Sequence, residues 1–423
     1  MIGIPIMKNS MIPKVAIIYG EGSASPLTIK ASSVGLCEII FLYTDCNKRD
    51  MSQLNLLKNH AKIFDITFLT DDEVVMLLHE EKVDAVLTFS ESQLSKTTRY
   101  CTKLNLIGHS IETVTALTDK YLQRELLSKF NVNSVKHAIV NRDCAIEAAE
   151  KVGFPAVLKP RVGAGSKWTG KIHSLQELQT ALIKGPPHYE YVLEEFLEGD
   201  DCFKDTFYGD YVSVESVHQE GVSQQICVTA KLPLTEHFAE TGMFLPHPFS
   251  PELVEKITEL ESGAIKALGV LDGITHTEIK ITADGPKIIE VNGRLGGYVP
   301  EIVKRSMGIN LVRTALEVSL GIKADIKPNS SSSSVDFQVF LTAPYNTDMV
   351  FDGIDGAKEV ENIDGVLHVE ITKDIGEIVD YRQGTQSNLG IVYGTSPNFE
   401  AFLRTINDIR TTIIPKISIK GEE

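Results

Sequence analysis

The sequence is poor in basic residues. Its 423 residues include 41 Lys and Arg against 57 Asp and Glu, which gives a net charge of −16. Binding a nucleic acid requires a basic surface whose Lys and Arg replace the counterions of the phosphates, so this balance argues against a nucleic-acid partner. A single nucleotide is still compatible with it, because a few local cations and a metal ion suffice for its phosphates.

Signals for disulfides, zinc and membranes are also missing. The six cysteines are scattered and form no C-x-x-C pair, which indicates reduced thiols and neither a disulfide framework nor a zinc site. No run reaches the roughly 20 apolar residues of a membrane span. The N-terminal segment MIGIPIMKNSMIPK lacks the apolar core of a signal peptide. We therefore expect a cytoplasmic protein with no membrane partner.

The dinucleotide-binding fingerprint is incomplete. The first apolar run ends in Gly20-Glu21-Gly22-Ser23, which lacks the third glycine of G-x-G-x-x-G. No acidic residue can be assigned to a ribose either. We interpret the segment as an ordinary strand-to-helix loop, which argues against a NAD-dependent oxidoreductase.

Residues 1–115 alternate short apolar runs with amphipathic stretches. Residues 15–19, 38–43 and 85–89 are rich in β-branched or aromatic side chains and predict strands, whereas residues 71–81 begin with two aspartates and predict a helix. This alternation is typical of βαβ units. An N-terminal α/β domain with a parallel sheet is therefore expected.

The rest of the chain predicts two α+β parts. Residues 116–195 are expected to form a small subdomain, and residues 196–423 a large one with a β-rich extension from about residue 335. In the small part we expect helices at 119–130, 143–152 and 175–183, strands at 135–140, 156–159 and 191–196, and a glycine-rich loop at 161–170. In the large part we expect a β-hairpin at 274–292, a linker or exposed turn at the serine run 329–334, and a closing helix at 398–409.

The hairpin brings two carboxylates together. A three-residue loop at 283–285, with its glycine in the left-handed conformation, places Glu278 directly opposite Glu290. Strand alternation then puts Asn292 on the face of Glu290 and His276 on the face of Glu278.

Opposed carboxylates on neighbouring strands repel each other, and a divalent cation removes the repulsion. Two Glu and one Asn offer only oxygen ligands, which suit Mg²⁺ or Mn²⁺. Two solvated glutamates on an open sheet face are the alternative, which fits poorly with the neighbouring Ile288, Ile289 and Val291. We therefore predict a magnesium site, with manganese as the second choice.

Two cationic motifs accompany this pair. Arg294 follows Asn292 within the glycine-rich turn 293–297, where a guanidinium can bind a phosphate or an oxyanion. Lys159 ends a predicted strand just before the glycine-rich loop, whose amides suit phosphates. That loop lacks the Walker spacing, and by itself a mobile turn is an equal alternative.

In this order along the chain, the motifs resemble the ATP-grasp superfamily. The likeness covers residues 108–320 and is specific because six motifs follow one another. It implies an ATP-grasp fold with an N-terminal parallel-sheet domain, a small lid subdomain and a large C-terminal subdomain. The motifs are Asp119-Lys120, Val157-Leu158-Lys159-Pro160, the glycine-rich loop, the VLEEFLEG segment at 192–199, Glu278, and Glu290-Val291-Asn292-Gly293-Arg294.

The resemblance implies ATP and Mg²⁺ as cofactors and a role for each motif. The glycine-rich loop would close as a lid that excludes water. Arg294 would stabilise an acyl phosphate and the tetrahedral intermediate, with Lys159 as the second catalytic residue. The implied residues are Lys120, Lys159, Gly163, Gly165 and Ser166 for the phosphates, Glu194, Glu195, Phe196 and Leu197 for the adenine hinge, and Glu278, Glu290 and Asn292 for the metal.

Residues 231–246 and the turn 293–298 further resemble the L-amino acid ligases, which make dipeptides. By that likeness, Glu240 contacts the amino group of an amino-acid substrate, and Tyr298 limits the size of the pocket. A surface carboxylate is the alternative interpretation of Glu240. The implied substrate-binding residues are Glu240, Arg294, Gly296, Gly297 and Tyr298.

The leading hypothesis is an ATP-dependent carboxylate–amine ligase that joins two L-amino acids through an acyl phosphate and releases ADP and phosphate. The alternatives are an ATP-grasp ligase for another carboxylic acid and a non-catalytic nucleotide-binding module, which the intact lysines, glutamates and arginine oppose. Expected partners are small molecules, and a homodimer is the commonest oligomer. The acidic residues lead to the hypothesis of a basic substrate such as arginine.

Overall fold

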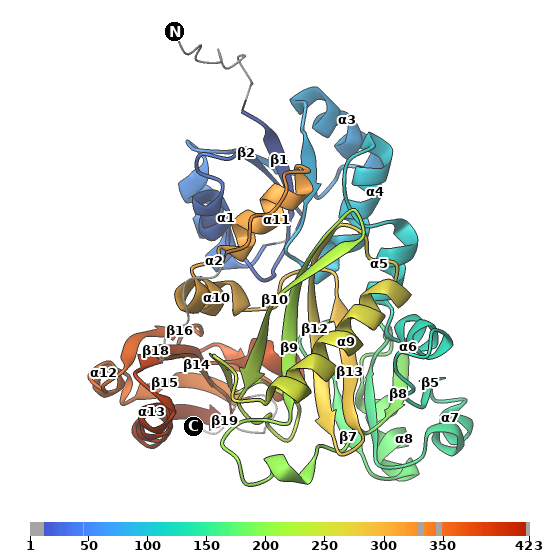
Figure 1. Ribbon diagram of the computed structural model, residues 1–423, viewed down its shortest axis with the longest axis vertical. Coiled ribbons are helices and arrows are strands. Elements are labelled where there is room, and N and C mark those ends of the chain that lie inside the picture. The colour runs from blue at the N-terminus through green and yellow to red at the C-terminus, as the bar shows by residue number, and fades with distance from the viewer. Residues whose placement is uncertain (1–11, 45, 328–333, 344–348, 420–423) are drawn as a thin grey trace.

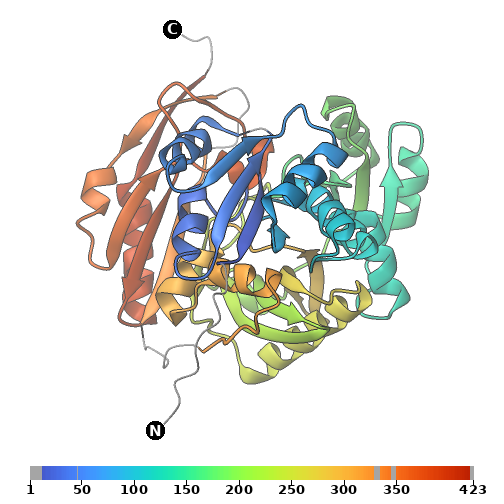
Figure 2. The same cartoon turned by 90° about the horizontal axis from the view of Figure 1, so that it is seen from above.

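The computed structural model describes residues 12–44, 46–327, 334–343 and 349–419. In these ranges the strands form four sheets of four, eight, three and four strands (Figure 1). Viewed from above, the N-terminal sheet lies between the C-terminal part and the small subdomain (Figure 2). No helix in the described ranges is long and apolar enough to cross a membrane.

The N-terminal sheet is parallel, as predicted, with the order β3-β2-β1-β4. The helix expected at 71–81 is confirmed and begins with a capping box between Thr70 and Glu73. The strand expected at 85–89 ends two residues early. The elements are β1 (Lys14–Tyr19), α1 (Pro26–Ser32), β2 (Glu38–Tyr43), α2 (Lys48–Leu57), β3 (Lys62–Asp65), α3 (Asp71–Glu81), β4 (Ala85–Leu87), η1 (Glu91–Gln93), α4 (Leu94–Leu104) and α5 (Ile111–Thr118).

The small subdomain has an antiparallel sheet of order β5-β8-β6-β7 that packs against two helices. The α+β prediction is confirmed here. Helix α6 starts one residue later than predicted because Asp119 is its N-cap, and Pro160 belongs to its strand as the last residue. The elements are α6 (Lys120–Lys129), β5 (His137–Val140), α7 (Ala145–Val152), β6 (Ala156–Pro160), β7 (Gly170–Ile172), α8 (Leu175–Lys184) and β8 (Tyr191–Glu195).

The central sheet is antiparallel, with the order β13-β12-β9-β10-β11-β14-β18-β16. Its last three strands come from the predicted β-rich extension, which therefore continues the central sheet through the pairing of β11 with β14. Its elements and those between them are η2 (Asp201–Phe203), β9 (Tyr211–Gln219), β10 (Val222–Lys231), β11 (Gly242–Leu245), α9 (Pro251–Ala267), β12 (Gly273–Thr282), β13 (Gly285–Asn292), α10 (Val299–Met307), α11 (Leu311–Ser319), β14 (Val335–Leu341), β16 (Val366–Ile371) and β18 (Gly390–Ser396).

The predicted helix of the C-terminal part is confirmed, but it is not the last element, because a strand follows it in the described residues. The helix expected at 398–409 exists, with Asn398 as its N-cap, but the alternating segment after it pairs with β15. Residues 329–333 of the serine run lie outside the described residues. The remaining elements are β15 (Met349–Asp355), α12 (Ala357–Val360), β17 (Ile378–Val379), η3 (Tyr381–Ser387), α13 (Phe399–Thr412) and β19 (Ile414–Ile419).

Two helices from the large part pack on the N-terminal sheet. Apolar side chains of α10 and α11 share one core with strands β1 and β2, and α11 lies beside α1 in Figure 1. Ser32 and Asn310 are hydrogen-bonded across this contact. The turn 293–298, which precedes α10, is thereby fixed against the N-terminal domain.

Phe402 tests the packing of the C-terminal part. Its side chain is fully buried, and its ring lies 5.0 Å from that of Phe244 and 5.3 Å from that of Phe337. Phe402→Ala should lower the free energy of unfolding by about 3–5 kcal/mol because it leaves a cavity. Denaturant titration measures the change. Leu403→Ala is the matched control, since Leu403 is 39% exposed; an equal loss in both variants would contradict the account.

Candidate active site

The hairpin formed by β12 and β13 pairs the two glutamates as predicted, but its turn differs from the predicted one. Glu278 faces Glu290, and His276 faces Asn292. The predicted three-residue loop is wrong, because Thr282 pairs with Gly285 and the turn has two residues. A bulge on β13 then adds one residue opposite the step from Glu278 to Ile279, which restores the expected register.

A buried histidine contacts the carboxylate of Glu278. The Nε2 atom of His276 lies 3.4 Å from Oε1 of Glu278, and its Nδ1 atom lies 2.6 Å from Oε1 of Glu215. Burial acts against the charge of His276, but Glu215 raises its pKa to about 9. Burial likewise opposes the charge of Glu278, yet His276 and nearby cations bring its pKa to about 2. Glu278 is therefore ionised at neutral pH.

This histidine also explains a glycine of the turn. A Cβ atom on Gly296 would come 2.7 Å from Cε1 of His276, so a side chain there would displace the imidazole. Gly297 differs, since a Cβ atom added there would meet nothing within 4 Å. Of the two predicted substrate-binding glycines, one is required by packing and the other borders open space.

Glu290 and Asn292 each contact a cation. Nζ of Lys120 lies 2.9 Å from Oε1 of Glu290. Burial opposes the charge of Lys120, but Glu290 raises its pKa above the usual value. Nη2 of Arg294 donates to Oδ1 of Asn292 at 3.3 Å. The structure thus brings the predicted phosphate lysine, the carboxylate pair and the arginine into one cluster.

Arg294 is oriented by a residue that sequence analysis missed. Its Nε atom lies 2.9 Å from Oε2 of Glu91, and Nη1 donates to the carbonyl of Leu295 at 2.8 Å. Glu91 lies in η1 of the N-terminal domain, and burial raises the pKa of its carboxyl group. Glu91 belongs to no motif and stands about 200 positions from Arg294. Only the fold brings the two together.

Lys159 shares the buried Glu194 with Arg124. Oε2 of Glu194 lies 2.8 Å from Nζ of Lys159 and 2.8 Å from Nη2 of Arg124. Burial raises the pKa of Glu194, but the two cations outweigh it and bring the value to about 2. Arg124 also donates to the carbonyls of Ile288 and Ile289, at 2.6 Å each, which ties helix α6 to the bulge of the hairpin.

The predicted adenine hinge is only partly open to a ligand. The side chain of Glu194 faces Lys159, and the amides of Glu195 and Phe196 already donate to the carbonyls of Lys136 and Pro155. An adenine would therefore contact the carbonyl groups of this segment and Leu197. Binding of adenine here stays a prediction. Nζ of Lys171 lies 3.6 Å from the ring centre of Phe196, which places a cation beside the hinge.

The glycine-rich loop joins β6 to β7 and is anchored at its base. The carboxylate of Asp119 binds Arg161, with Nη2 at 2.6 Å, and the amide of Lys120 donates to the carbonyl of Arg161. Nζ of Lys120 donates to the carbonyl of Gly163. Gly165 and Ser166 have φ angles of 68° and 58°. Glycine adopts this left-handed conformation freely, but a residue with a side chain rarely does, so the backbone of the loop is strained at Ser166.

Glu240 is paired with a buried lysine. Oε1 of Glu240 lies 2.7 Å from Nζ of Lys231, which is 1% exposed. Glu240 and Glu278 outweigh the effect of burial and raise the pKa of Lys231. Because Glu240 pairs with the buried Lys231, it is not a solvated surface carboxylate. Tyr298 is the N-cap of α10 and has a φ angle of 63°, and its ring lies 5.1 Å from that of Phe340.

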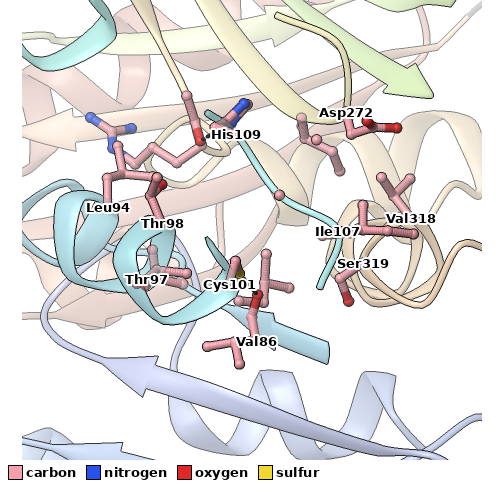
Figure 3. Close-up of a pocket in the computed structure, with 18 of the residues that line it drawn as sticks. Val86, Leu94, Thr97, Thr98, Cys101, Ile107, His109, Asp272, Val318 and Ser319 are labelled. Carbon is pink, nitrogen blue, oxygen red and sulfur yellow. Dashed lines mark hydrogen bonds between the residues drawn. The ribbon is translucent and has the colours of Figure 1, made fainter. Parts of the chain in front are cut away.

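A pocket of about 60 Å³ adjoins the turn that carries Arg294. Figure 3 shows it between Thr97, Thr98 and Cys101 of α4 on one side and Val318 and Ser319 of α11 on the other. A volume of this size holds a few water molecules and is too small for a nucleotide. The pocket is therefore not a nucleotide site.

The donor set fits a magnesium ion that is shared with phosphates. In the described ranges, no group of three or more His, Cys, Asp or Glu side chains could hold a metal ion by itself. The two opposed glutamates and Asn292 provide hard oxygen atoms, of which at least Glu278 is ionised. Mg²⁺ commonly binds through one or two carboxylates together with substrate phosphates. Glu278, Glu290 and Asn292 would therefore hold the metal.

Comparison with known proteins identifies a domain and a fold. Residues 152–301 match the ATP-grasp domain family. The crystal structure of an L-amino acid ligase from Bacillus licheniformis superposes with a TM-score of 0.75 at 22% identity, covering 96% of this chain and 98% of that one. The predicted ATP-grasp fold is confirmed. The chain therefore contains an ATP-grasp domain.

The chain is also similar to enzymes with named amino-acid substrates. It is 25% identical over 346 residues to the L-arginine-specific L-amino acid ligase of Bacillus subtilis, covering 78% of this chain and 79% of that one. It is 27% identical over 279 residues to the alanine–anticapsin ligase of Bacillus subtilis strain 168, covering 60% of this chain and 58% of the ligase. N5-carboxyaminoimidazole ribonucleotide synthetase from Thermotoga maritima shares the fold, with a TM-score of 0.69 at 17% identity and coverage of 96% and 100%.

Glu194 gives a test of the buried charges. Its folded pKa of about 2 lies below the unfolded value of 4.5, so it stabilises the fold above pH 4.5 and loses this effect as the pH falls toward 2. Glu194→Gln leaves Lys159 and Arg124 without their carboxylate and should cost roughly 3–5 kcal/mol at pH 7. When the free energy of unfolding is measured from pH 7 to pH 3.5, the difference between Glu194→Gln and the native protein should decrease.

Glu190→Gln is the control for this substitution, because Glu190 pairs with Arg161 while 72% exposed. It should change stability by less than about 0.5 kcal/mol at every pH. A pH-independent gap for Glu194→Gln would contradict an ionised Glu194.

Proposed function

We propose that the protein is an ATP-dependent ligase that joins two L-amino acids through an acyl phosphate. The observation that carries this proposal is the cluster in which the Glu278–Glu290 pair lies beside Lys120 and Arg294. It combines a place for a divalent cation with cations suited to phosphates. A site of this composition serves phosphoryl transfer, where positioning and charge neutralisation provide most of the catalysis.

The proposed reaction has two steps. A carboxylate oxygen of the first amino acid attacks the γ-phosphorus of ATP, and the bond to ADP breaks. The amine of the second amino acid then attacks the acyl carbon, phosphate leaves, and the nitrogen loses a proton to solvent. Magnesium, when bound, would neutralise the phosphate oxygens. Lys120 and Lys159 would orient the phosphates, and Arg294 would stabilise the oxyanion of the tetrahedral intermediate.

The surroundings of Arg294 support its proposed role. Glu91 and Asn292 contact different nitrogens of its guanidinium and so fix its plane. A guanidinium held in this way needs little reorganisation when negative charge develops on the substrate, which is the condition for effective electrostatic stabilisation.

Glu240 and Tyr298 support an amino-acid substrate. Lys231 holds the Glu240 carboxylate in place, and such a carboxylate can accept hydrogen bonds from the ammonium group of an amino acid. Burial raises the pKa of the Tyr298 hydroxyl, and the carboxylates of Glu370, Glu21 and, with the smallest effect, Glu240 raise it further. This acidic setting and the similarity to an arginine-specific ligase support a basic amino acid as one of the two substrates.

The function can be tested with a substrate panel. Phosphate release from ATP and magnesium is measured with all twenty L-amino acids, singly and in pairs, and the products are analysed by mass spectrometry. We expect release that depends on amino acids and a dipeptide mass, with a preference for a basic partner. ATP binding without turnover on any pair would point to a different carboxylic acid, and absence of ATP binding would contradict the proposal.

Arg294→Ala should lower kcat by about 10²–10³-fold, because it removes the charge that faces the oxyanion. Arg294→Lys should recover little of the loss, since an ammonium cannot reproduce the planar set of donors. Binding of MgADP, measured by calorimetry, should change little. Arg404→Ala is the control, because Arg404 pairs with Glu400 on the surface. Full activity in Arg294→Ala would exclude it as a catalytic residue.

A further inference from the structure

A short segment of the C-terminal part contacts the glycine-rich lid. Residues 380–388, which include the 3-10 helix η3, approach the lid loop between β6 and β7. The amide of Trp168 donates to the carbonyl of Arg382 at 2.8 Å, and the amide of Thr385 donates to the carbonyl of Gly165 at 3.0 Å. Backbone groups of the lid therefore pair with backbone groups of a part of the chain that is more than 200 residues away.

Two side-chain features strengthen this contact. The guanidinium carbon of Arg382 lies 4.8 Å from the ring centre of Trp168, a cation–π arrangement. Asp380 binds Nε of Arg382 with both carboxylate oxygens at 2.9 Å, which fixes the guanidinium over the ring. Trp168 is itself in the left-handed conformation, with a φ angle of 53°.

Gly384 allows the close approach of the two segments. Its φ angle is 59°, and a Cβ atom there would overlap the carbonyl of Gly165 and come 2.7 Å from the carbonyl carbon of Ser166. Any side chain at this position would push the lid away. Ser387 donates to the carbonyl of Gly384 at 2.7 Å, and the amide of Leu389 donates to Leu341 in the central sheet at 2.7 Å. The segment is thus supported by the rigid sheet.

The same segment also reaches the loop that carries Glu240. The ring of Tyr381 lies 4.5 Å from that of His237, with 34° between their planes. His237 belongs to the loop between β10 and β11, which a hydrogen bond from Thr241 to Pro233 closes. Residues 380–388 therefore contact both the proposed phosphate lid and the proposed amino-acid loop.

We propose that residues 380–388 form a latch that holds the lid closed over the reacting groups, with Arg382 and Gly384 as positioning residues. Closure excludes water from an acyl phosphate, which water would otherwise convert to the free acid and phosphate. The contact of Tyr381 with His237 connects closure to the amino-acid loop. The latch can be observed without turnover, and only its effect on coupling rests on the proposed ligase function.

Trp168 is the single tryptophan of the chain, so its fluorescence reports on the lid alone. Acrylamide quenching is compared in the native protein, Arg382→Ala and Gly384→Ala, with and without MgADP. Loss of the cation–π contact should shift the closed-to-open ratio about two- to fivefold in Arg382→Ala. Gly384→Ala should expose Trp168 further, because the lid cannot approach. Unchanged quenching in both variants would overturn the latch.

The controls separate lid opening from general damage. Gly376→Ala matches Gly384→Ala, because Gly376 also has a positive φ angle, 88°, but no atom lies within 4 Å of an added Cβ. Arg404→Ala matches Arg382→Ala as the loss of one arginine that pairs with a carboxylate, at a position away from the lid. Neither control should change the quenching, and exposure of Trp168 in both would attribute the effect to lost stability and overturn the proposal.

Coupling is the second readout. With an amino-acid pair that supports turnover, the native protein should release one phosphate per amide bond, and both latch variants should release more phosphate than product. Raised quenching with unchanged coupling would overturn the positioning role of Arg382 and Gly384. If no pair supports turnover while the quenching results stand, the ligase proposal fails and the latch does not.

Discussion

The opposition of Glu278 and Glu290 on the hairpin is the constraint on which the site depends. Two carboxylates this close are unfavourable unless cations surround them. The structure supplies His276 beneath Glu278 and Lys120 beside Glu290. Each cation is in turn held elsewhere, His276 by Glu215 and Lys120 by the carbonyl of Gly163. The contacts that balance the charges of Glu278 and Glu290 therefore extend from the central sheet to the glycine-rich loop.

The site is assembled from parts that lie far apart in the sequence. The N-terminal domain contributes Glu91, the small subdomain contributes Lys159 and Glu194, and the hairpin contributes the proposed metal ligands. Arg124 joins the small subdomain to the hairpin, because it binds Glu194 and donates a hydrogen bond to a carbonyl group at the bulge of β13. Helices α10 and α11 fix the turn with Arg294 against the N-terminal sheet. Productive geometry therefore requires the packing of every part.

Local patterns in the sequence predicted most elements and the pairing of the two glutamates. They failed where long-range pairing decides, as in the strand after α13 and the continuation of the central sheet by β14. Glu91, Arg124 and Glu215 could not be found from motifs, because their roles come from tertiary contacts. The hairpin loop was mispredicted by one residue, and a bulge that no local signal marks compensated for it. The proposed division at residues 115 and 195 and the assigned roles in the site remain proposals.

The central claim is that a carboxylate is phosphorylated at this site before the amide bond forms. It is tested most directly with an amino acid labelled with ¹⁸O in its carboxylate, by mass spectrometry of the phosphate released during turnover with MgATP. The account predicts one labelled oxygen in each phosphate, because the acyl–oxygen bond breaks when the amine attacks. Phosphate without label, or release of pyrophosphate in its place, would contradict the acyl phosphate.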